Sequence, residues 1–327
     1  MNMQKFNLLY KTQKGEFFIA DFQELYYSYL RKYYKHKIQL IITSPPFPLN
    51  EKKKYGNYQG EEYKEWFGSL APLFSDLLKD DGSLVIELGN AWEPKRPVQS
   101  TLHLESLLSL VKHPKVGLHL IQEFIIYNPS RLPSPAQWVT VNRIRTIDSY
   151  THVWWIAKSD FPKADNRRIL RPYSRSMKKL FEERKYNAGK RPSGHNISEK
   201  SFLKDNGGSI AHNFFELEQI EENREVRLPH NVLSFSNTSS NNYFLKTCRE
   251  RDIIPHPARM PNGIVEFFIE FLTDEDDLVF DSFAGSNTTG FCAEKMKRKW
   301  IACEINRSYG EQSMIRFEDP VLKSGCY

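Results

Sequence analysis

The sequence has little cysteine and no paired cysteine motif. Only four cysteines occur among 327 residues, Cys248, Cys292, Cys303 and Cys326, and no two of them form a CxxC pair. This excludes a disulfide scaffold and a zinc ribbon, and it fits a reducing compartment. Cys292 and Cys303 lie in apolar stretches, so we expect buried free thiols there. The sequence predicts no metal site.

Long hydrophobic runs are also absent. No apolar run approaches the roughly 18 residues that a membrane-spanning helix needs. The N-terminal segment becomes polar too early for a signal peptide, so the sequence predicts a cytoplasmic protein without a membrane partner. A composition of 40% hydrophobic and 26% charged residues is typical of a folded globular chain, and 327 residues allow one large domain or two ordinary ones.

Positive charge is concentrated in one segment. The whole chain has a formal net charge of +6, yet residues 161–200 alone hold 12 basic and four acidic residues, a net charge of +8. The other 287 residues carry 34 basic and 36 acidic side chains, a net charge of −2. From charge alone, a solvated basic face and a surface for phosphate groups both explain such a segment.

Short apolar runs rich in Ile, Val and aromatic residues predict buried strands. They cover Phe17–Ala20, Ile38–Thr43, Ser83–Leu88, Gly117–Tyr127, Val153–Ala157, Leu278–Phe283 and Trp300–Glu304. Helical spacing of apolar residues predicts helices at Glu61–Leu78, Ile264–Leu272 and Gly290–Lys297. The alternation predicts an α/β doubly wound, mostly parallel sheet, with the runs at 117–127 and 153–157 as an antiparallel pair at its edge.

Residues 161–250 interrupt this pattern, since they are basic, then polar, and almost without strand signals. We interpret them as a loop-rich insertion. The chain then divides into residues 1–160 and 251–327, two halves of one sheet domain, and the inserted region 161–250.

The first segment with chemical meaning is 41–47, where a predicted strand ends in Ser44, two prolines and Phe47. Ligands of open α/β sheets bind beyond the carboxyl ends of the strands. The prolines remove backbone donors and stiffen the turn, so carbonyls and the Ser44 hydroxyl remain as acceptors for an exocyclic NH2 group. Phe47 offers a flat face on which a base can stack. The alternative is a plain turn after a strand.

The second segment is 278–290, where a predicted strand ends in Asp281 and small residues then open a helix. Small residues let a ligand approach the backbone at a helix N-terminus. The Gly-Lys-Ser/Thr of a P-loop and the second glycine of a dinucleotide fingerprint are absent. Glu304 ends the next predicted strand, where an acid can accept hydrogen bonds from ribose hydroxyls. The pattern favours an adenosine-containing cofactor over an ordinary strand–turn–helix joint, and both segments together favour methyl transfer to a nucleobase.

On these segments the chain resembles the S-adenosylmethionine-dependent DNA methyltransferases that modify an exocyclic amino group. Thr43–Phe47 matches the catalytic motif of that family, Asp281–Ser286 matches its cofactor motif, and His256–Pro261 resembles the segment that leads into the cofactor motif. The catalytic motif comes first and a recognition region lies between, which is the permuted order of the β class. The resemblance implies a Rossmann-like sheet with an inserted target-recognition region at 161–250.

Ser44 in place of Asp before the two prolines resembles the N4-cytosine group of this family. Further stretches resemble the PvuII-type modification methyltransferases: Asn128–Pro135, Arg191–His195 and Lys204–Ile210. The likeness weakens at residues 211–230, so no recognition sequence is transferred. The permutation also implies that the strand at 17–20 lies beside the strand ending at Glu304, with Asp21 near the cofactor; a helix-capping role is the alternative for Asp21.

The resemblance implies the following site residues. The catalytic residues are Ser44, Pro45, Pro46 and Phe47, with the Ser44 hydroxyl and Pro45 carbonyl accepting from cytosine N4 after the base is flipped out of the duplex. The residues expected to bind S-adenosylmethionine are Asp21, Thr43, His256, Pro257, Asp281, Phe283, Gly285, Ser286, Asn287 and Glu304.

Duplex DNA is the expected partner, together with a cognate restriction endonuclease as a genetic partner; the oligomeric state is left open. The expected DNA-binding residues are Lys52, Lys53, Arg131, Arg167, Arg168, Arg171, Arg175, Arg191, Ser193, His195 and Asn206. The alternatives are methylation of adenine N6, a DNA-binding protein with a decayed site, and methylation of RNA or protein.

Overall fold

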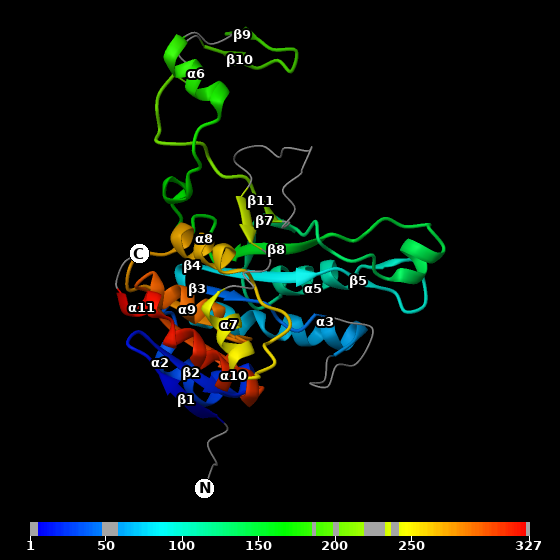
Figure 1. The fold of residues 1–327 in the computed structure, drawn as a ribbon, viewed down its shortest axis with the longest axis vertical. Helices are drawn as coiled ribbons and strands as arrows, with labels where there is room; N and C mark the ends of the chain where they lie inside the picture. Colours follow the sequence, from blue (N-terminus) through cyan, green and yellow to red (C-terminus); the bar gives the residue numbers. More distant parts are fainter. Residues whose placement is uncertain are drawn as a thin grey trace.

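The computed structural model describes residues 6–47, 58–184, 188–198, 203–218, 233–236 and 242–324. Its main feature is a sheet of ten strands with helices on both faces (Figure 1). In order across the sheet, the strands are β1 (Asn7–Lys11), β2 (Gly15–Ile19), β14 (Lys299–Glu304), β13 (Leu278–Asp281), β3 (Ile38–Thr43), β4 (Leu78–Gly89), β8 (Tyr150–Ala157), β7 (His119–Tyr127), β11 (Phe214–Glu218) and β12 (Leu233–Ser236).

Two short hairpins and a set of helices complete the described chain. The hairpins are β5 (Ala91–Trp92) with β6 (Gln99–Ser100), and β9 (Gly189–Lys190) with β10 (Asn196–Ile197). The α-helices are α1 (Phe22–Leu25), α2 (Arg31–Tyr34), α3 (Gly60–Ser69), α4 (Ala71–Leu77), α5 (Leu102–Val111), α6 (Arg175–Glu183), α7 (Tyr243–Glu250), α8 (Asn262–Leu272), α9 (Thr288–Lys295), α10 (Arg307–Ser313) and α11 (Pro320–Ser324). Two π-helices, η1 (Tyr26–Leu30) and η2 (Gln137–Val141), and two 3₁₀ helices, η3 (Asn166–Ile169) and η4 (Met314–Glu318), lie between them.

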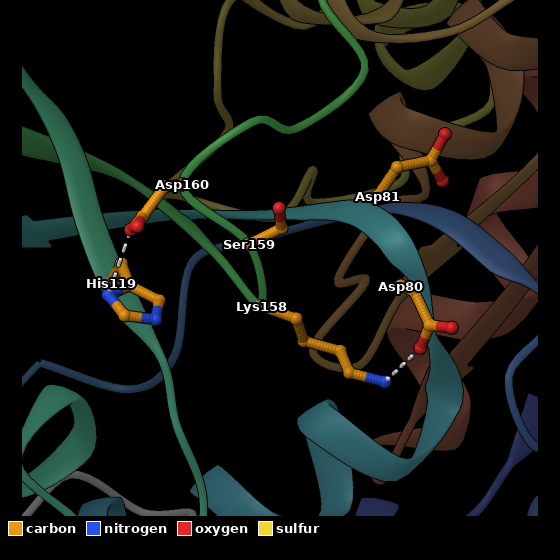
Figure 2. A pocket seen from close by; sticks show the side chains of 6 residues that line it. All are labelled: Asp80, Asp81, His119, Lys158, Ser159 and Asp160. Atoms are coloured by element: carbon orange, nitrogen blue, oxygen red, sulfur yellow. Dashed lines mark hydrogen bonds and ion pairs between the residues drawn. The ribbon is translucent and has the colours of Figure 1, made fainter.

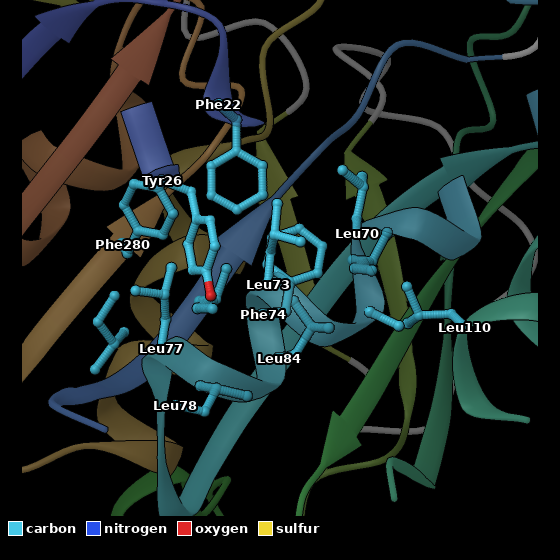
Figure 3. Packing of buried hydrophobic residues seen from close by; sticks show 14 of the residues in the cluster. Phe22, Tyr26, Leu70, Leu73, Phe74, Leu77, Leu78, Leu84, Leu110 and Phe280 are labelled. Carbon is cyan, nitrogen blue, oxygen red and sulfur yellow. The ribbon is translucent and has the colours of Figure 1, made fainter. Parts of the chain in front are cut away.

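The central strand β3 explains why the sheet is covered on both faces. All six of its residues are buried, and its apolar residues divide between two hydrophobic clusters. Ile41 belongs to a cluster with α1, α3 and α4, part of which is drawn in Figure 3, whereas Leu40 and Ile42 belong to a cluster with α8 and α9. Side chains of a strand point alternately to its two faces, so a continuous apolar run forms two core layers. The predicted doubly wound α/β fold is confirmed.

Strand directions match the predicted, mostly parallel sheet. β2, β14, β13, β3 and β4 are parallel, and β8 is antiparallel to both β4 and β7. The antiparallel pair of β7 and β8 therefore exists as expected, but it does not form the edge, because β11 and β12 continue the sheet beyond β7. The antiparallel strand that does form an edge is β1, which pairs with β2.

The two ends of the described chain meet in the sheet. β14 pairs in parallel with β2, and Glu304 lies opposite Ile19. The neighbouring positions of these strands were expected from the permuted motif order and are confirmed. The pairing brings Glu304 and Asp21 to the same end of the sheet, although they are separated by most of the sequence.

Two boundaries differ from the sequence-based expectation. The single helix expected at 61–78 is divided into α3 and α4, since Pro72 lacks a backbone N–H and lies in the first turn of α4. The strand β11 lies inside the region 161–250 that we expected to be loop-rich. Its apolar run is short and lies between polar residues, so the sequence pattern did not indicate a strand. In the structure, Phe215 is fully buried, stacks on Phe124 and contacts Phe267 edge-on.

The middle of the region 161–250 stands apart from the sheet. Helix α6 and the β9–β10 hairpin project beyond β11 and the rest of the body, at the top of Figure 1. Neither element contains a buried side chain, and their basic residues are mostly exposed. We call α6 with this hairpin the basic arm.

The described cysteines behave as expected from their apolar surroundings. Cys248, Cys292 and Cys303 are buried and unpaired, whereas Cys326 lies outside the described residues. Burial raises the pKa of the Cys292 thiol, which makes it a poor nucleophile. None of the helices in the described part of the chain is long and apolar enough to cross a membrane.

Phe215→Ala should show how much the added strand β11 contributes to the fold. The ring is fully buried in an aromatic cluster, so its loss should lower the free energy of unfolding by about 3–5 kcal/mol. Urea denaturation monitored by tryptophan fluorescence measures this. Phe161→Ala is the control, because Phe161 is 88% exposed. Equal small effects of both substitutions would contradict the role given to β11.

Candidate active site

A single cleft gathers most of the predicted site residues. It has a volume of about 960 Å³ and lies at the carboxyl ends of β2, β14, β13, β3, β4 and β7. Of the predicted catalytic and cofactor residues, the lining contains Asp21, Ser44, Pro45, Pro46, Phe47, His256, Pro257, Asp281, Phe283, Gly285, Ser286 and Glu304. Thr43 and Asn287 are buried beside the cleft and are not part of its lining.

The Asp281 carboxylate joins the two motif segments. One oxygen accepts hydrogen bonds from the Thr43 hydroxyl at 2.8 Å and the Phe283 N–H at 3.1 Å, and the other accepts from the Thr289 hydroxyl at 2.7 Å. Thr43 ends β3, and Thr289 lies in the first turn of α9. Three elements that are distant in sequence are thereby fixed around one side chain. The Thr43 hydroxyl therefore positions the Asp281 carboxylate and does not itself line the cleft.

Burial raises the pKa of Asp281 to about 6, although its three hydrogen bonds each favour the charged form. Desolvation thus raises the pKa of Asp281 by more than the three hydrogen bonds lower it. The carboxylate is ionised above that pH and depends on its donors for stability in the interior.

Glu304 fixes the turn after β13. Its carboxylate accepts from the Gly285 N–H at 2.9 Å and the Asn306 N–H at 2.8 Å, and burial raises its pKa. Gly285 has a φ of +50°, and a Cβ there would lie 3.2 Å from the His256 ring, so a side chain would be strained by the backbone and crowded by the ring. The His256 ring packs edge-on against the Tyr309 ring, with 4.3 Å between the ring centroids. The Ile305 N–H also stabilises the charged form of Glu304, and a carboxylate with about four lone-pair sites can still accept a hydrogen bond from the cleft.

Two of the predicted cofactor residues have internal roles. Asp21 lines the cleft, but it also caps α1, because its carboxylate accepts from the N–H groups of Gln23 and Glu24. Asn287 caps α9 by accepting from the Gly290 N–H and donates to the Tyr10 hydroxyl. The structure therefore does not place the Asn287 side chain with the cofactor candidates.

Ser44 has a partner that we did not predict from the sequence. Its hydroxyl donates a 2.7 Å hydrogen bond to Glu87 on β4, and the Thr151 hydroxyl donates to the other oxygen of Glu87 at 3.4 Å. The Glu87 side chain is half-buried in the cleft wall, and desolvation raises its pKa. A lone acid inside the apolar run at 83–88 was the available signal, since a charge is rare in a buried strand.

The rest of the predicted catalytic segment is held by contacts with α3 and β4. The Pro46 carbonyl accepts a hydrogen bond from the Tyr63 hydroxyl at 2.9 Å. Phe47 packs directly on Gly89, where a Cβ would lie 2.8 Å from the ring. The ring therefore stands in the cleft wall between β3 and β4, where a planar ligand could stack on it.

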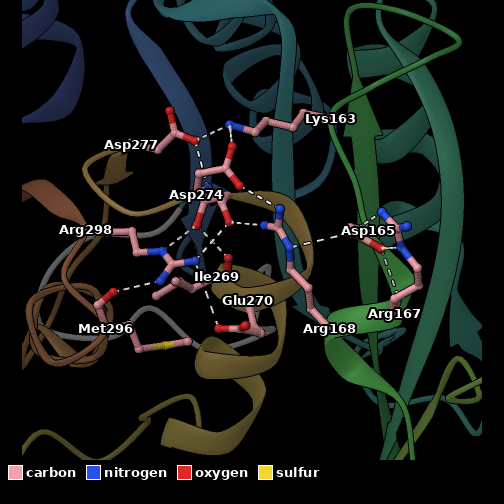
Figure 4. A network of polar contacts seen from close by, with 11 residues as sticks. Lys163, Asp165, Arg167, Arg168, Ile269, Glu270, Asp274, Asp277, Met296 and Arg298 are labelled. Carbon is pink, nitrogen blue, oxygen red and sulfur yellow. Dashed lines mark hydrogen bonds and ion pairs between the residues drawn. The ribbon is translucent and has the colours of Figure 1, made fainter. Parts of the chain in front are cut away.

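The predicted DNA-binding residues do not form one surface. Arg131 lines the cleft. Arg167 is paired with Asp165, and Arg168 with Asp165 and Asp274 (Figure 4). Asp274 lies in the loop before β13, at the opposite end of the sheet from the cleft. Arg167 and Arg168 thus pair with nearby carboxylates and are not part of the cleft lining.

The other predicted residues lie on or near the basic arm. Arg191, Ser193 and His195 form the turn of the β9–β10 hairpin, closed by a bond from the Arg191 N–H to the His195 carbonyl. Arg175 is exposed at the start of α6, and Arg171 pairs through its backbone with Ser209. The Asn206 N–H donates to the Tyr173 hydroxyl at the base of the arm. Lys52 and Lys53 lie outside the described residues.

A second hollow lies at the other end of the sheet (Figure 2). Asp80 and Asp81 at the start of β4 line it together with Lys158, His119 and Asp160. Lys158 is paired with Asp80, and His119 with Asp160, so the polar groups satisfy one another. Among the residues the structure describes, no group of three His, Cys, Asp or Glu side chains is arranged to hold a metal ion.

Thr289→Val tests whether Asp281 depends on its hydroxyl donors. Losing one donor to a buried carboxylate should lower the free energy of unfolding by about 1–3 kcal/mol at pH 8. The loss should be smaller at pH 5, because the Asp281 carboxyl, with its pKa of about 6 in the folded state, is then mostly protonated. Denaturant unfolding at both pH values measures the difference. Thr146→Val, at an exposed site, is the control, and a pH-independent cost would contradict the argument.

Comparison with known proteins agrees with this geometry. Residues 38–314 match the N6/N4 methylase family, described as DNA methylase. The type II methyltransferase M.PvuII of Proteus hauseri is 42% identical over 312 residues, which cover 95% of this chain and 85% of that protein. The orphan methyltransferase M.BamHII of Bacillus amyloliquefaciens is 24% identical over 288 residues, covering 87% of this chain and 90% of the relative.

Solved structures also superpose on this chain. The structure described as PvuII DNA methyltransferase (cytosine-N4-specific) superposes with a TM-score of 0.70 and 33% identity, and the match covers 97% of each chain. The M1.HpyAVI–SAM complex, at 16% identity and a TM-score of 0.50, shares the fold over 93% of this chain and 100% of that one. The resemblance expected from the motifs is therefore confirmed, and the chain belongs to the N6/N4 DNA methylase family and is a DNA methyltransferase.

Proposed function

We propose that this enzyme transfers the methyl group of S-adenosylmethionine to N4 of a cytosine in duplex DNA. The observation that carries the proposal is the hydrogen bond from Ser44 to Glu87 at the rim of the cleft. It lies across one cleft from the Asp281–Gly285 turn and Glu304. The similarity to a cytosine-N4-specific enzyme over nearly the whole chain supports the same choice of atom.

S-adenosylmethionine would be held at the carboxyl ends of β13 and β14. Glu304 ends β14 and keeps acceptor capacity beyond its backbone donors, which suits a ribose hydroxyl. Asp21, across β2, faces the same part of the cleft. The Phe283–Ser286 turn lets the ligand approach the backbone closely, because Gly285 carries no side chain. When bound, this cofactor supplies an electrophilic methyl group.

Ser44 would activate the amino group. Its proton is donated to Glu87, so both oxygen lone pairs of the hydroxyl can accept a hydrogen bond from N4–H. The Pro45 carbonyl is the second acceptor in the turn. Hydrogen bonds to both amino protons draw N4 out of conjugation with the ring, which frees its lone pair to attack the methyl group.

The product nitrogen must then lose one proton. As N4 gains its bond to carbon, a proton of N4 passes to Ser44 Oγ while the hydroxyl proton passes to Glu87, which later releases it to solvent. Burial raises the pKa of Glu87, and a more basic carboxylate is a better proton acceptor at neutral pH. No covalent bond between enzyme and base is required.

The DNA duplex must open for this chemistry, because N4 is paired inside it. We propose that the target cytosine is flipped into the cleft and stacks on Phe47. The basic arm, with its exposed basic side chains on α6 and the hairpin, would contact phosphates and contribute a salt-dependent part of the affinity. A cognate restriction endonuclease is the proposed genetic partner, and the cytoplasm is the proposed site of action.

The proposed function is tested by expressing the chain in methylation-deficient bacteria and sequencing their DNA with a method that distinguishes N4-methylcytosine from N6-methyladenine. We expect N4-methylcytosine at one short sequence, and mass spectrometry of the nucleosides checks the modified base. N6-methyladenine, or no modified base with soluble folded protein, would contradict the proposal.

Glu87→Gln should lower kcat by about 10²-fold or more, because the proton acceptor is lost. In the wild-type enzyme, the rate should fall as the pH drops through the pKa of Glu87, which burial places above the ordinary glutamate value; this decline should vanish in the variant. Single-turnover methylation from pH 5 to pH 9 measures both effects. Glu65→Gln, at an exposed position of α3, is the control, and a retained acid limb in Glu87→Gln would refute the role.

Glu304→Ala should weaken S-adenosylmethionine binding by about tenfold or more, because a hydrogen-bonded charged group is lost from the ribose site. DNA affinity should change little. Isothermal titration with the cofactor and fluorescence anisotropy with DNA separate the two effects. The matched control is Glu311→Ala on the exposed face of α10. Unchanged cofactor affinity would remove Glu304 from the site.

A further inference from the structure

Arg131 is a basic side chain in the wall of the catalytic part of the cleft. It lines the cleft together with Ser44, Phe47 and Glu87. We propose that its guanidinium group reads the target base by donating hydrogen bonds to N3 and O2 of the flipped cytosine, and so selects cytosine over adenine. This inference rests on the proposed function and names the residue that would determine its base specificity.

The backbone around Arg131 is fixed by local hydrogen bonds. β7 ends at Tyr127, and the Asn128 N–H donates to the Ser149 carbonyl at 2.7 Å, which closes the base of the long connection to β8. The Asn128 side chain accepts from the Ser130 N–H at 3.0 Å, and the Arg131 N–H donates to the Asn128 carbonyl at 3.2 Å. These bonds form a tight Asx turn. Arg131 is therefore held at the carboxyl end of a sheet strand.

The guanidinium group lies close to the catalytic hydrogen bonds. One of its nitrogens donates to the Tyr150 carbonyl at 3.4 Å. The next residue, Thr151, donates its hydroxyl to Glu87, which also accepts from Ser44. Arg131 lowers the pKa of Glu87 through its charge, although burial has the larger and opposite effect. The arginine thus stands beside the Ser44–Glu87 pair and keeps most of its N–H donors available.

No carboxylate among the described residues lies within ion-pair distance of Arg131, in contrast to Arg167 and Arg168. Arg259 is the other arginine of the cleft lining, and it donates to the His256 carbonyl on the cofactor side. Among the described lining residues, Arg131 is therefore the guanidinium group on the side of the cleft that would hold the base.

The hydrogen-bonding edge of cytosine explains why an arginine fits there. That edge presents the N4 amino donor, then two neighbouring acceptors, N3 and O2. Ser44 and Pro45 would satisfy only the amino group, and base acceptors that lose their water on binding without gaining a donor are costly. A planar guanidinium group with two parallel N–H donors satisfies two neighbouring acceptors at once.

Adenine presents a different edge. Its N6 amino group can be bound by the same two acceptors of the enzyme, but beside it lie one acceptor, N1, and a C2–H group. One donor of Arg131 would then face a C–H group and remain unpaired. Sites that require a hydrogen-bonding partner reject analogues that lack it far more strongly than apolar pockets do. Ser44 and Pro45 cannot make this distinction, because both bases carry the amino group.

The test is a double-mutant cycle between enzyme and base. Duplexes carry the recognition sequence found by sequencing, with cytosine or 2-thiocytosine at the target position, because sulfur is a weaker acceptor than oxygen. We expect the wild-type enzyme to lose about tenfold or more in kcat/KM on 2-thiocytosine. In Arg131→Gln this loss should shrink to less than about threefold, because glutamine is shorter and lacks the two parallel N–H donors of the guanidinium fork. Arg131→Lys, which retains the charge without the fork, should behave like Arg131→Gln.

The control is Arg143→Gln, an exposed arginine in the same connection between β7 and β8. It should retain the full penalty for 2-thiocytosine. A duplex with adenine at the target position adds a second readout: the ratio of kcat/KM for cytosine to that for adenine should fall in Arg131→Gln and stay unchanged in Arg143→Gln. Thermal melting checks that each variant is folded.

Three results would overturn the inference. The first is an undiminished 2-thiocytosine penalty in folded Arg131→Gln and Arg131→Lys. The second is an Arg131→Gln variant that only reduces the slope of log affinity against log salt by about one, which marks a phosphate contact. The third is a wild-type enzyme that methylates no cytosine in any sequence; this result alone also refutes the proposed function, whereas the first two leave it standing.

Discussion

The buried carboxylate of Asp281 is the interaction on which the geometry of the site depends. It accepts hydrogen bonds from Thr43 and Thr289, and so ties the end of β3 to the start of α9 through the end of β13. Thr43 immediately precedes Ser44, so the same bonds set where the Ser44 hydroxyl, the proposed catalytic group, lies relative to the turn that would hold the cofactor. A buried charge tolerates little movement of its donors. The two motif segments, at opposite ends of the permuted chain, are therefore positioned by one side chain.

Three acids in the cleft share a raised pKa but differ in their hydrogen-bond donors. Asp281 is held by structural hydroxyls and a backbone N–H, Glu304 by backbone N–H groups, and Glu87 by the Ser44 and Thr151 hydroxyls. Backbone donors and buried threonines keep their protons, so Asp281 and Glu304 serve as fixed negative groups. Glu87 differs because the Ser44 hydroxyl at the cleft surface can exchange its proton with a ligand. The hydrogen-bond donors, more than the pKa shifts, distinguish the two structural acids from Glu87, the proposed proton acceptor.

Local features of the site could be predicted from the sequence, whereas contacts made across the fold could not. One strand ends in Ser-Pro-Pro-Phe, and another ends in Asp followed by small residues. These residue types determine the local turn, so both turns could be predicted without knowing the fold. Glu87 was missed because its meaning depends on Ser44, which reaches it only through the pairing of β3 with β4. Arg168 was predicted to bind DNA from the charge of its segment. The sequence does not show that its partner in the fold is Asp274, which is distant along the chain. Asn287 lies within the motif, yet its amide is used to cap a helix.

The fold also divides the positive charge that the sequence concentrates in residues 161–200. Lys163 and Arg168 are neutralised by Asp274 and Asp277 at the far end of the sheet, while most arginines and lysines of the basic arm are exposed away from the body. The floor of the cleft carries carboxylates instead. This separation suits two ligands of opposite charge, a cationic methyl donor and polyanionic DNA. Basic residues on the cleft floor would repel the donor, and acids on the arm would repel phosphates. Arg131 lines the cleft beside the Ser44–Glu87 pair, where a neutral base would bind.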